Sequence, residues 1–285
     1  MGVRRLPTYF TLWHLMGHYG LKSLAYLVLA FLMLPILVII PLSFNAEPYF
    51  TFSEGMLAFD RAAYSTRWYA GIFVDEKWML AIKNSFIIGT ASATLATVLG
   101  TMAAVGLASP AMPFKRTITA VLLSPIIVPV IIVAAGMFFF YTNFGLVGSY
   151  PGLILAHAAL GVPFVVITVT ATLVGFDRAL FNAGVGLGGS PLRVFWDVVI
   201  PLIRPGVIAG ALFAFAASFD EVVVVLFMAG PEQRTIPRQM FAGLREQINP
   251  TNLAVATLLI LLSMALLLTL EFLRRRSERL RGFEA

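Results

Sequence analysis

The sequence contains no cysteine and few charged residues. The missing cysteine excludes disulfides, thiolate metal sites and a cysteine nucleophile. Charged residues make up 12% of the 285 residues and hydrophobic residues 59%, whereas a soluble domain carries about 25% charged residues. So little charge cannot cover a water-soluble particle. We therefore predict an all-α, polytopic membrane protein that forms one domain over residues 1–285.

Several catalytic motifs are also missing. The chain has no G-x-x-x-x-G-K-[ST] phosphate loop, so it is not itself expected to hydrolyse ATP. It has no H-E-x-x-H zinc motif and no G-x-S-x-G nucleophile motif. We therefore predict that the chain is not an enzyme and holds no catalytic residues, no metal and no cofactor of its own.

Long runs without charge predict six transmembrane helices. Such a run must cover a hydrocarbon core of about 30 Å, at about 1.5 Å per residue. The second run is rich in Gly, Ala and Thr, which favours close packing against neighbouring helices. The predicted spans are residues 23–46, 84–108, 117–142, 152–175, 205–228 and 252–273.

The net charge of +6 comes from basic residues that flank the apolar runs. This distribution is typical of contact with membrane lipid and does not favour a nucleic-acid partner. If the N-terminus is cytoplasmic, 13 of the 20 Lys and Arg residues fall on the cytoplasmic side. The positive-inside rule therefore predicts that both termini are cytoplasmic.

The segment between the fourth and fifth spans, residues 177–201, is more apolar than a cytoplasmic connection should be. Ser190-Pro191 is typical of a helix start, and we expect that helix to end at Pro201. Four glycines precede it, at positions 184, 186, 188 and 189, and predict a tight turn between two short helices. Five apolar residues of the segment need a partner surface: Phe181, Leu187, Val194, Phe195 and Trp196.

The spacing of this segment resembles the cytoplasmic EAA loop of ABC-importer permeases. That pattern is Glu-Ala-Ala, three residues, Gly, nine residues and Ile-x-Leu-Pro. Here Asn182-Ala183-Gly184, Gly188 and Val198-Val199-Ile200-Pro201 stand at those positions. The resemblance implies helices that dock on an ATP-binding subunit, with Asn182, Ala183, Gly184, Gly188, Ser190, Pro191 and Pro201 in the coupling segment. Asn182 replaces the family's glutamate, so a salt bridge made by that glutamate is absent or replaced by a neutral hydrogen bond.

Further segments resemble the spermidine/putrescine (PotC-like) branch of these inner-membrane permeases. The resemblance implies a bacterial inner-membrane subunit that works with a second homologous permease, two ATP-binding subunits that carry ATP and Mg, and a periplasmic solute-binding protein. It implies a small cationic solute such as putrescine or spermidine, while relatives of the same architecture carry other small solutes, such as amino-acid derivatives or opines. The segments are Thr66-Arg67-Trp68-Tyr69, Asn84-Ser85, Ser124-Pro125-Ile126-Ile127, Pro163-Phe164-Val165-Val166, Gly175-Phe176-Asp177 and Ser218 to Val224.

Asp220 and Glu221 form an acidic pair inside the predicted fifth span. A carboxylate within a bilayer costs several kcal/mol unless it faces protein or water, so the pair is a candidate substrate site for a cationic amine. Adjacent helical residues point about 100° apart. One carboxylate is then expected to face the pathway and the other a neighbouring helix or subunit, and the sequence leaves open which. A structural ion pair with a partner subunit is the alternative.

Aromatic residues supply further candidates for the pathway. Phe219 adjoins the acidic pair, and Tyr141 closes the Phe138-Phe139-Phe140-Tyr141 run, which could offer cation–π faces or form an interfacial belt. His157 is predicted to make a hydrogen bond between helices. The outer loop between the fifth and sixth spans, about residues 230–250 with Arg234 and Arg238, is either a docking surface for a binding protein or a solvated loop.

Two functions of other classes compete with an ATP-driven permease. The first is an ion-coupled secondary transporter that uses Asp220, Glu221 and His157, and the second is a membrane enzyme. Neither provides a partner for the apolar cytoplasmic segment, so the sequence favours the permease.

Overall fold

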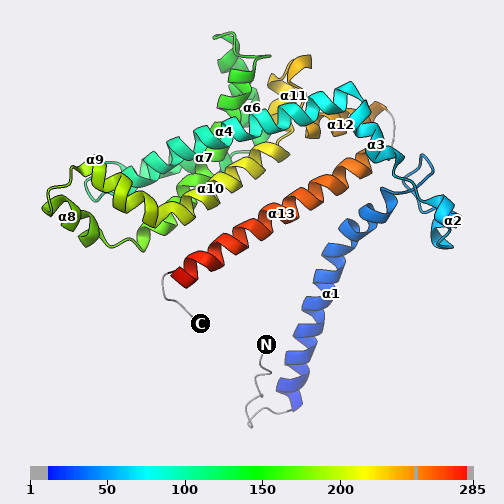
Figure 1. The fold of residues 1–285 in the computed structure, drawn as a ribbon, viewed down its shortest axis with the longest axis horizontal. Helices are drawn as coiled ribbons and strands as arrows, with labels where there is room; N and C mark the ends of the chain where they lie inside the picture. Colours follow the sequence, from blue (N-terminus) through cyan, green and yellow to red (C-terminus); the bar gives the residue numbers. More distant parts are fainter. Residues whose placement is uncertain (1–11, 247–249, 281–285) are drawn as a thin grey trace. The chain divides into compact units, whose positions relative to one another are not determined.

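The structure, a computed structural model, describes residues 12–246 and 250–280. Within these ranges the helices are joined by turns and loops, and the only β-type pairing is an isolated bridge between Asn45 and Tyr64. The chain forms two compact units, residues 1–70 with 248–260 and residues 71–247 with 261–285. Figure 1 labels the helices. In chain order they are α1 (Leu12–Leu42), α2 (Glu54–Leu57), η1 (Arg61–Ala63), α3 (Arg67–Val74), α4 (Glu76–Ala108), α5 (Lys115–Ile127), α6 (Val130–Thr142), α7 (Tyr150–Val174), α8 (Arg178–Gly186), α9 (Pro191–Val194), η2 (Phe195–Val199), α10 (Ile200–Asp220), α11 (Val223–Met228), η3 (Pro231–Gln233), α12 (Ile236–Glu246) and α13 (Thr251–Leu280).

Within the described residues, five helices are long and apolar enough to cross a membrane, and α5 with α6 makes a sixth if the bent pair counts as one span. This confirms the predicted all-α membrane class. The predicted span over residues 117–142 consists of two helices, α5 and α6, which meet at an angle of 106°. Pro129 lies at the bend, where its ring cannot donate the backbone hydrogen bond that a continuing helix needs.

In the first unit, side-chain hydrogen bonds hold the segment that follows α1. The indole Nε1 of Trp68 donates to the carbonyl of Asn45 at 2.7 Å, and the hydroxyls of Tyr69 and Ser43 lie 2.6 Å apart. The amide of Asn45 in turn donates to the carbonyl of Thr51 at 2.8 Å. Trp68 and Tyr69 thus hold this part of the chain together.

The second unit is built on α4, α7 and α10, which pack along one another (Figure 1). Glycines let their backbones approach closely. A Cβ added at Gly100 of α4 would lie 2.6 Å from Cβ of Val165 in α7, and one added at Gly210 of α10 would lie 2.9 Å from Cα of Val165. Small residues at helix contacts are the usual means of packing in lipid. The close packing predicted for the second span is confirmed.

The two ends of this three-helix core carry different elements. Figure 1 shows α8 and α9 at one end of α4, α7 and α10, and α11 and α12 at the other. The 21 residues of α10 connect the two ends, a rise of about 30 Å. The coupling segment and the acidic pair therefore lie at opposite ends of the unit.

Candidate functional site

The coupling segment begins with two short helices, as predicted. Asp177 caps α8, its carboxylate accepting from the backbone N–H of Ala179 at 2.9 Å, and Ser190 caps α9, its hydroxyl accepting from the N–H of Arg193 at 3.3 Å. The turn between them requires glycine at Gly188, where φ is +90°. Side chains on α8 and α9 are thereby held in a fixed arrangement.

The second of these helices does not end at Pro201, so that prediction is wrong. A π-helical turn, Phe195–Val199, follows α9 and leads into α10 without a break. Pro201 therefore stands inside a continuous helical stretch, two residues after the π turn. The helix that ends at Asp220 is therefore continuous with α9.

The apolar side chains of the segment divide into two groups. Val194 is buried against the elbow, where a Cβ on Gly184 or Gly189 would lie 2.9 Å from one of its methyl groups, and Phe181 and Phe195 pack on the core of the unit. Leu187 and Trp196 are 90% and 60% exposed. Three of the five predicted surface residues are thus covered by the chain itself, and two are left to a partner.

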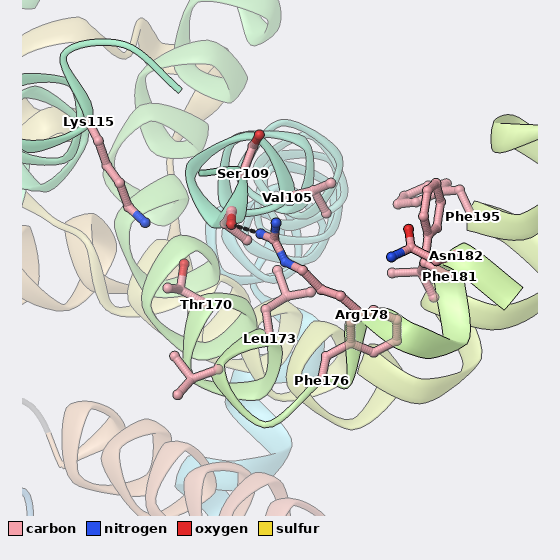
Figure 2. Close-up of a pocket in the computed structure, with 13 residues that line it drawn as sticks. Val105, Ser109, Lys115, Thr170, Leu173, Phe176, Arg178, Phe181, Asn182 and Phe195 are labelled. Atoms are coloured by element: carbon pink, nitrogen blue, oxygen red, sulfur yellow. Dashed lines mark hydrogen bonds between the residues drawn. The ribbon is translucent and has the colours of Figure 1, made fainter. Parts of the chain in front are cut away.

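A cavity of about 510 Å³ lies beneath α8 (Figure 2). Its wall includes Asn182, two basic residues, Lys115 and Arg178, and the rings of Phe176, Phe181 and Phe195. The guanidinium of Arg178 donates to the carbonyl of Ala108 at the end of α4. A cation suits the negative end of a helix dipole, so Arg178 ties the start of the coupling segment to α4.

The acidic pair lies at a break between helices and not inside one. The prediction of a continuous span over residues 205–228 is wrong, because α10 ends at Asp220 and α11 begins at Val223. A carboxylate oxygen of Glu221 accepts from the backbone N–H of Val224 at 2.9 Å. Asp220 is exposed, and no hydrogen bond or ion pair to its carboxylate occurs among residues 12–246 and 250–280.

Asp220 and Glu221 line a shallow hollow of about 340 Å³ together with Phe164, Phe213, Ala216 and Ala217. None of these six residues is basic. Phe164 and Phe213 were not singled out for this site from the sequence. They come from α7 and α10, and a signal for them would have been the seven-residue spacing of Phe213 from Asp220 on one helix, which places both on one face.

Phe219 and Tyr141 do not line this hollow. Phe219 is buried, and its ring lies 5.2 Å from the rings of both Phe86 and Phe215. Tyr141 is half-buried and packs in a second apolar cluster with Val224 and Met228. Both residues support the helices around the hollow, and their predicted place in the pathway is untested.

His157 makes the hydrogen bond between helices that the sequence predicts. Its Nδ1 lies 2.8 Å from the hydroxyl of Ser218, which joins α7 to the last turn of α10. Both residues are buried.

The outer loop is ordered by hydrogen bonds to the ends of α4 and α7. The amide of Asn84 donates to the carbonyls of Glu232 and Arg234 at 2.8 and 2.9 Å, and the hydroxyl of Tyr150 donates to the amide oxygen of Asn84 at 2.7 Å. Burial, and then the charge of Arg234, lower the pKa of Arg238, whose guanidinium donates to the carbonyls of Ala229 and Gly230. Hydrogen bonds thus hold the loop in one conformation, and docking of a binding protein on it stays a prediction.

Comparison with known proteins shows which family has this architecture. Residues 96–281 match the family described as binding-protein-dependent transport system inner membrane component. The putrescine transport system permease protein PotI of Escherichia coli is 32% identical over 81% of this chain and 82% of its own length. The spermidine/putrescine transport system permease protein PotC of Haemophilus influenzae is 29% identical over 90% of this chain and 96% of its own.

Solved structures agree on the fold. A bacterial ABC transporter that imports the acidic polysaccharide alginate superposes with a TM-score of 0.67 at 13% identity, over 94% of this chain and 99% of that one. The methionine ABC transporter MetNI superposes with a TM-score of 0.55 at 16% identity, over 74% of this chain and all of that one. With about two thirds of its length matched by the family, the chain belongs to the binding-protein-dependent transport system inner membrane components, the permease subunits of ABC transporters.

Proposed function

We propose that this chain is the permease subunit of an ATP-driven importer for a polyamine such as putrescine or spermidine. The observation that carries the proposal is its similarity to polyamine permeases over most of the chain, joined to a basic-free acidic hollow at the end of α10. A carboxylate facing aromatic rings favours an ammonium group. A trehalose permease, SugB of Mycobacterium tuberculosis, is 28% identical, but a neutral sugar gives no reason for an unpaired carboxylate.

The coupling segment would transmit the energy of ATP hydrolysis. Asn182, Ala183 and Gly184 lie on α8, and Gly188, Ser190 and Pro191 form the elbow and the start of α9. Leu187 and Trp196 offer exposed apolar surface to an ATP-binding subunit. Since α9 continues into α10 through Pro201, a shift of the segment would move the helix that carries Asp220. ATP and Mg would be bound by that subunit and not by this chain.

In the assembly we propose, this permease pairs with a second, homologous permease, and two ATP-binding subunits hold the two coupling segments. A periplasmic binding protein would deliver solute to the opposite end, where the outer loop lies. Both termini would be cytoplasmic, as the distribution of basic residues favours.

The proposal is tested by association with the ATP-binding subunit of the proposed assembly. Leu187→Glu and Trp196→Glu should each abolish copurification of that subunit, because a charge replaces an apolar contact. The matched control is Leu57→Glu, a substitution at a residue of α2 that is 68% exposed, lies outside the predicted spans and is distant in sequence from the segment. Retention of the ATP-binding subunit by both coupling-segment variants would contradict the proposed docking.

A further inference from the structure

The two carboxylates of the hollow differ in what they contact. Glu221 accepts a hydrogen bond from the N–H of Val224, the second residue of α11, at 2.9 Å. The first N–H groups of a helix have no partner within it, and a side-chain acceptor just before the helix supplies one. Asp220 serves no such purpose among the described residues and stays exposed. The carboxylate of Glu221 is thus engaged in a hydrogen bond to α11, whereas the carboxylate of Asp220 makes none among the described residues.

The carbonyl groups at the C-terminal end of α11 also have hydrogen-bond partners outside the helix. Arg238 of α12 donates to the carbonyls of Ala229 and Gly230, each at 2.9 Å, and the N–H of Gly148 donates to the carbonyl of Met228 at 2.8 Å. A helix of six residues is too short to be stable alone. Glu221 and Arg238 place opposite charges at the ends of α11 that suit them, so Glu221 belongs to the support of this short helix.

The free carboxylate lies among groups suited to an ammonium ion. Asp220, Phe164 and Phe213 line one hollow whose remaining members are two alanines and Glu221. Phe213 is 41% exposed, so its ring is accessible to a solute. A carboxylate and aromatic faces around one small hollow are the groups that hold an alkylammonium group by charge and by cation–π attraction.

We propose that Asp220, together with Phe164 and Phe213, binds the ammonium end of the transported cation, and that Glu221 is a positioning residue that holds α11 and does not bind the solute. This inference rests on the proposed function, because it assigns the roles within its acidic pair. It decides between the two carboxylates, which the sequence could not separate.

The test uses the complete assembly in proteoliposomes, with ATP inside and binding protein and labelled putrescine outside. Asp220→Asn should raise KM for putrescine about tenfold, the loss of one charge-assisted contact, while the maximal rate stays within about twofold. Glu221→Gln keeps an oxygen that can accept from Val224 and should keep KM and the maximal rate, whereas Glu221→Ala should lower the maximal rate. A normal maximal rate in Glu221→Gln together with a lowered one in Glu221→Ala would identify Glu221 as a helix cap.

Two ring substitutions complete the test. Phe213→Leu keeps apolar volume without a π face and should raise KM a few-fold. Phe227→Leu, at a residue of α11 that is 38% exposed and does not line the hollow, should leave KM unchanged. The inference is overturned if Asp220→Asn leaves KM as it was while Glu221→Gln raises it. If the unsubstituted assembly takes up another solute but no polyamine, the proposed function fails, and the ammonium assignment fails with it.

Discussion

His157 Nδ1 lies 2.8 Å from the hydroxyl of Ser218, so α7 and α10 are joined two residues before the break at Asp220. The contact is buried on both sides. A buried polar side chain without a partner is costly, and in a bilayer water does not replace the partner. This hydrogen bond therefore fixes the end of α10 against α7 and with it the place where Asp220 leaves the helix.

A double-mutant cycle measures that contact. His157→Phe and Ser218→Ala should each destabilise the chain, and the coupling energy between them should be about 0.6 kcal/mol, with an upper bound of about 1.7 kcal/mol, as for other hydrogen bonds between membrane helices. Reversible unfolding in mixed micelles gives the energies. In the control, His157→Phe is paired with Thr94→Val, which removes a hydroxyl that donates within its own helix, and the effects should add. Full additivity of the His157 and Ser218 substitutions would argue against the contact.

The packing of α4 on α7 predicts opposite effects for two glycines of one helix. Gly100→Ala would place a Cβ 2.6 Å from Val165 Cβ, and such overpacking costs about 1–3 kcal/mol. Gly106→Ala meets nothing within 4 Å and should be neutral or stabilise the helix by up to about 1 kcal/mol. The midpoints of thermal unfolding in detergent would show the difference. Equal midpoints for the two variants would mean that the helices do not approach this closely.

The elbow of the coupling segment provides a second matched pair. Gly188 has φ of +90°, and a side chain there costs about 1–2 kcal/mol, relieved only if the turn changes shape. Gly188→Ala should therefore reduce ATP-dependent uptake, while Gly186→Ala, with an ordinary φ and nothing within 4 Å of its added Cβ, should not. Uptake and the copurified amount of ATP-binding subunit are measured together. An unimpaired Gly188→Ala variant would show that the elbow geometry is unimportant.

The sequence predicted where helices exist better than where they break. Charge-free runs reveal which residues tolerate lipid, and this located α1, α4, α7, α10 and α13. They do not reveal continuity, because residues on both sides of a break are equally apolar. The break at residues 221–222 is therefore not evident from hydrophobicity. Conversely, Pro201 looked like a helix end, but it lies inside a helical stretch that runs from α9 through a π turn into α10.

For the candidate site, the residue types were predictable and their contacts were not. The spacing of the coupling segment placed its helices and its elbow, yet only the structure separates Leu187 and Trp196, which are exposed, from Val194, which the glycines cover. The acidic pair was evident as two charges in an apolar run. Its division into a cap and a free carboxylate depends on where α10 ends, and hydrophobicity carries no information on that point.

The central claim is that this chain moves a polyamine only as part of an ATP-driven assembly. Its most direct test is uptake of labelled putrescine into proteoliposomes that contain this chain, the partner permease and the ATP-binding subunit, with binding protein outside. We predict uptake that requires ATP and stops when the ATP-binding subunit is omitted. Putrescine uptake by this chain alone, driven by an ion gradient without ATP, would contradict the account.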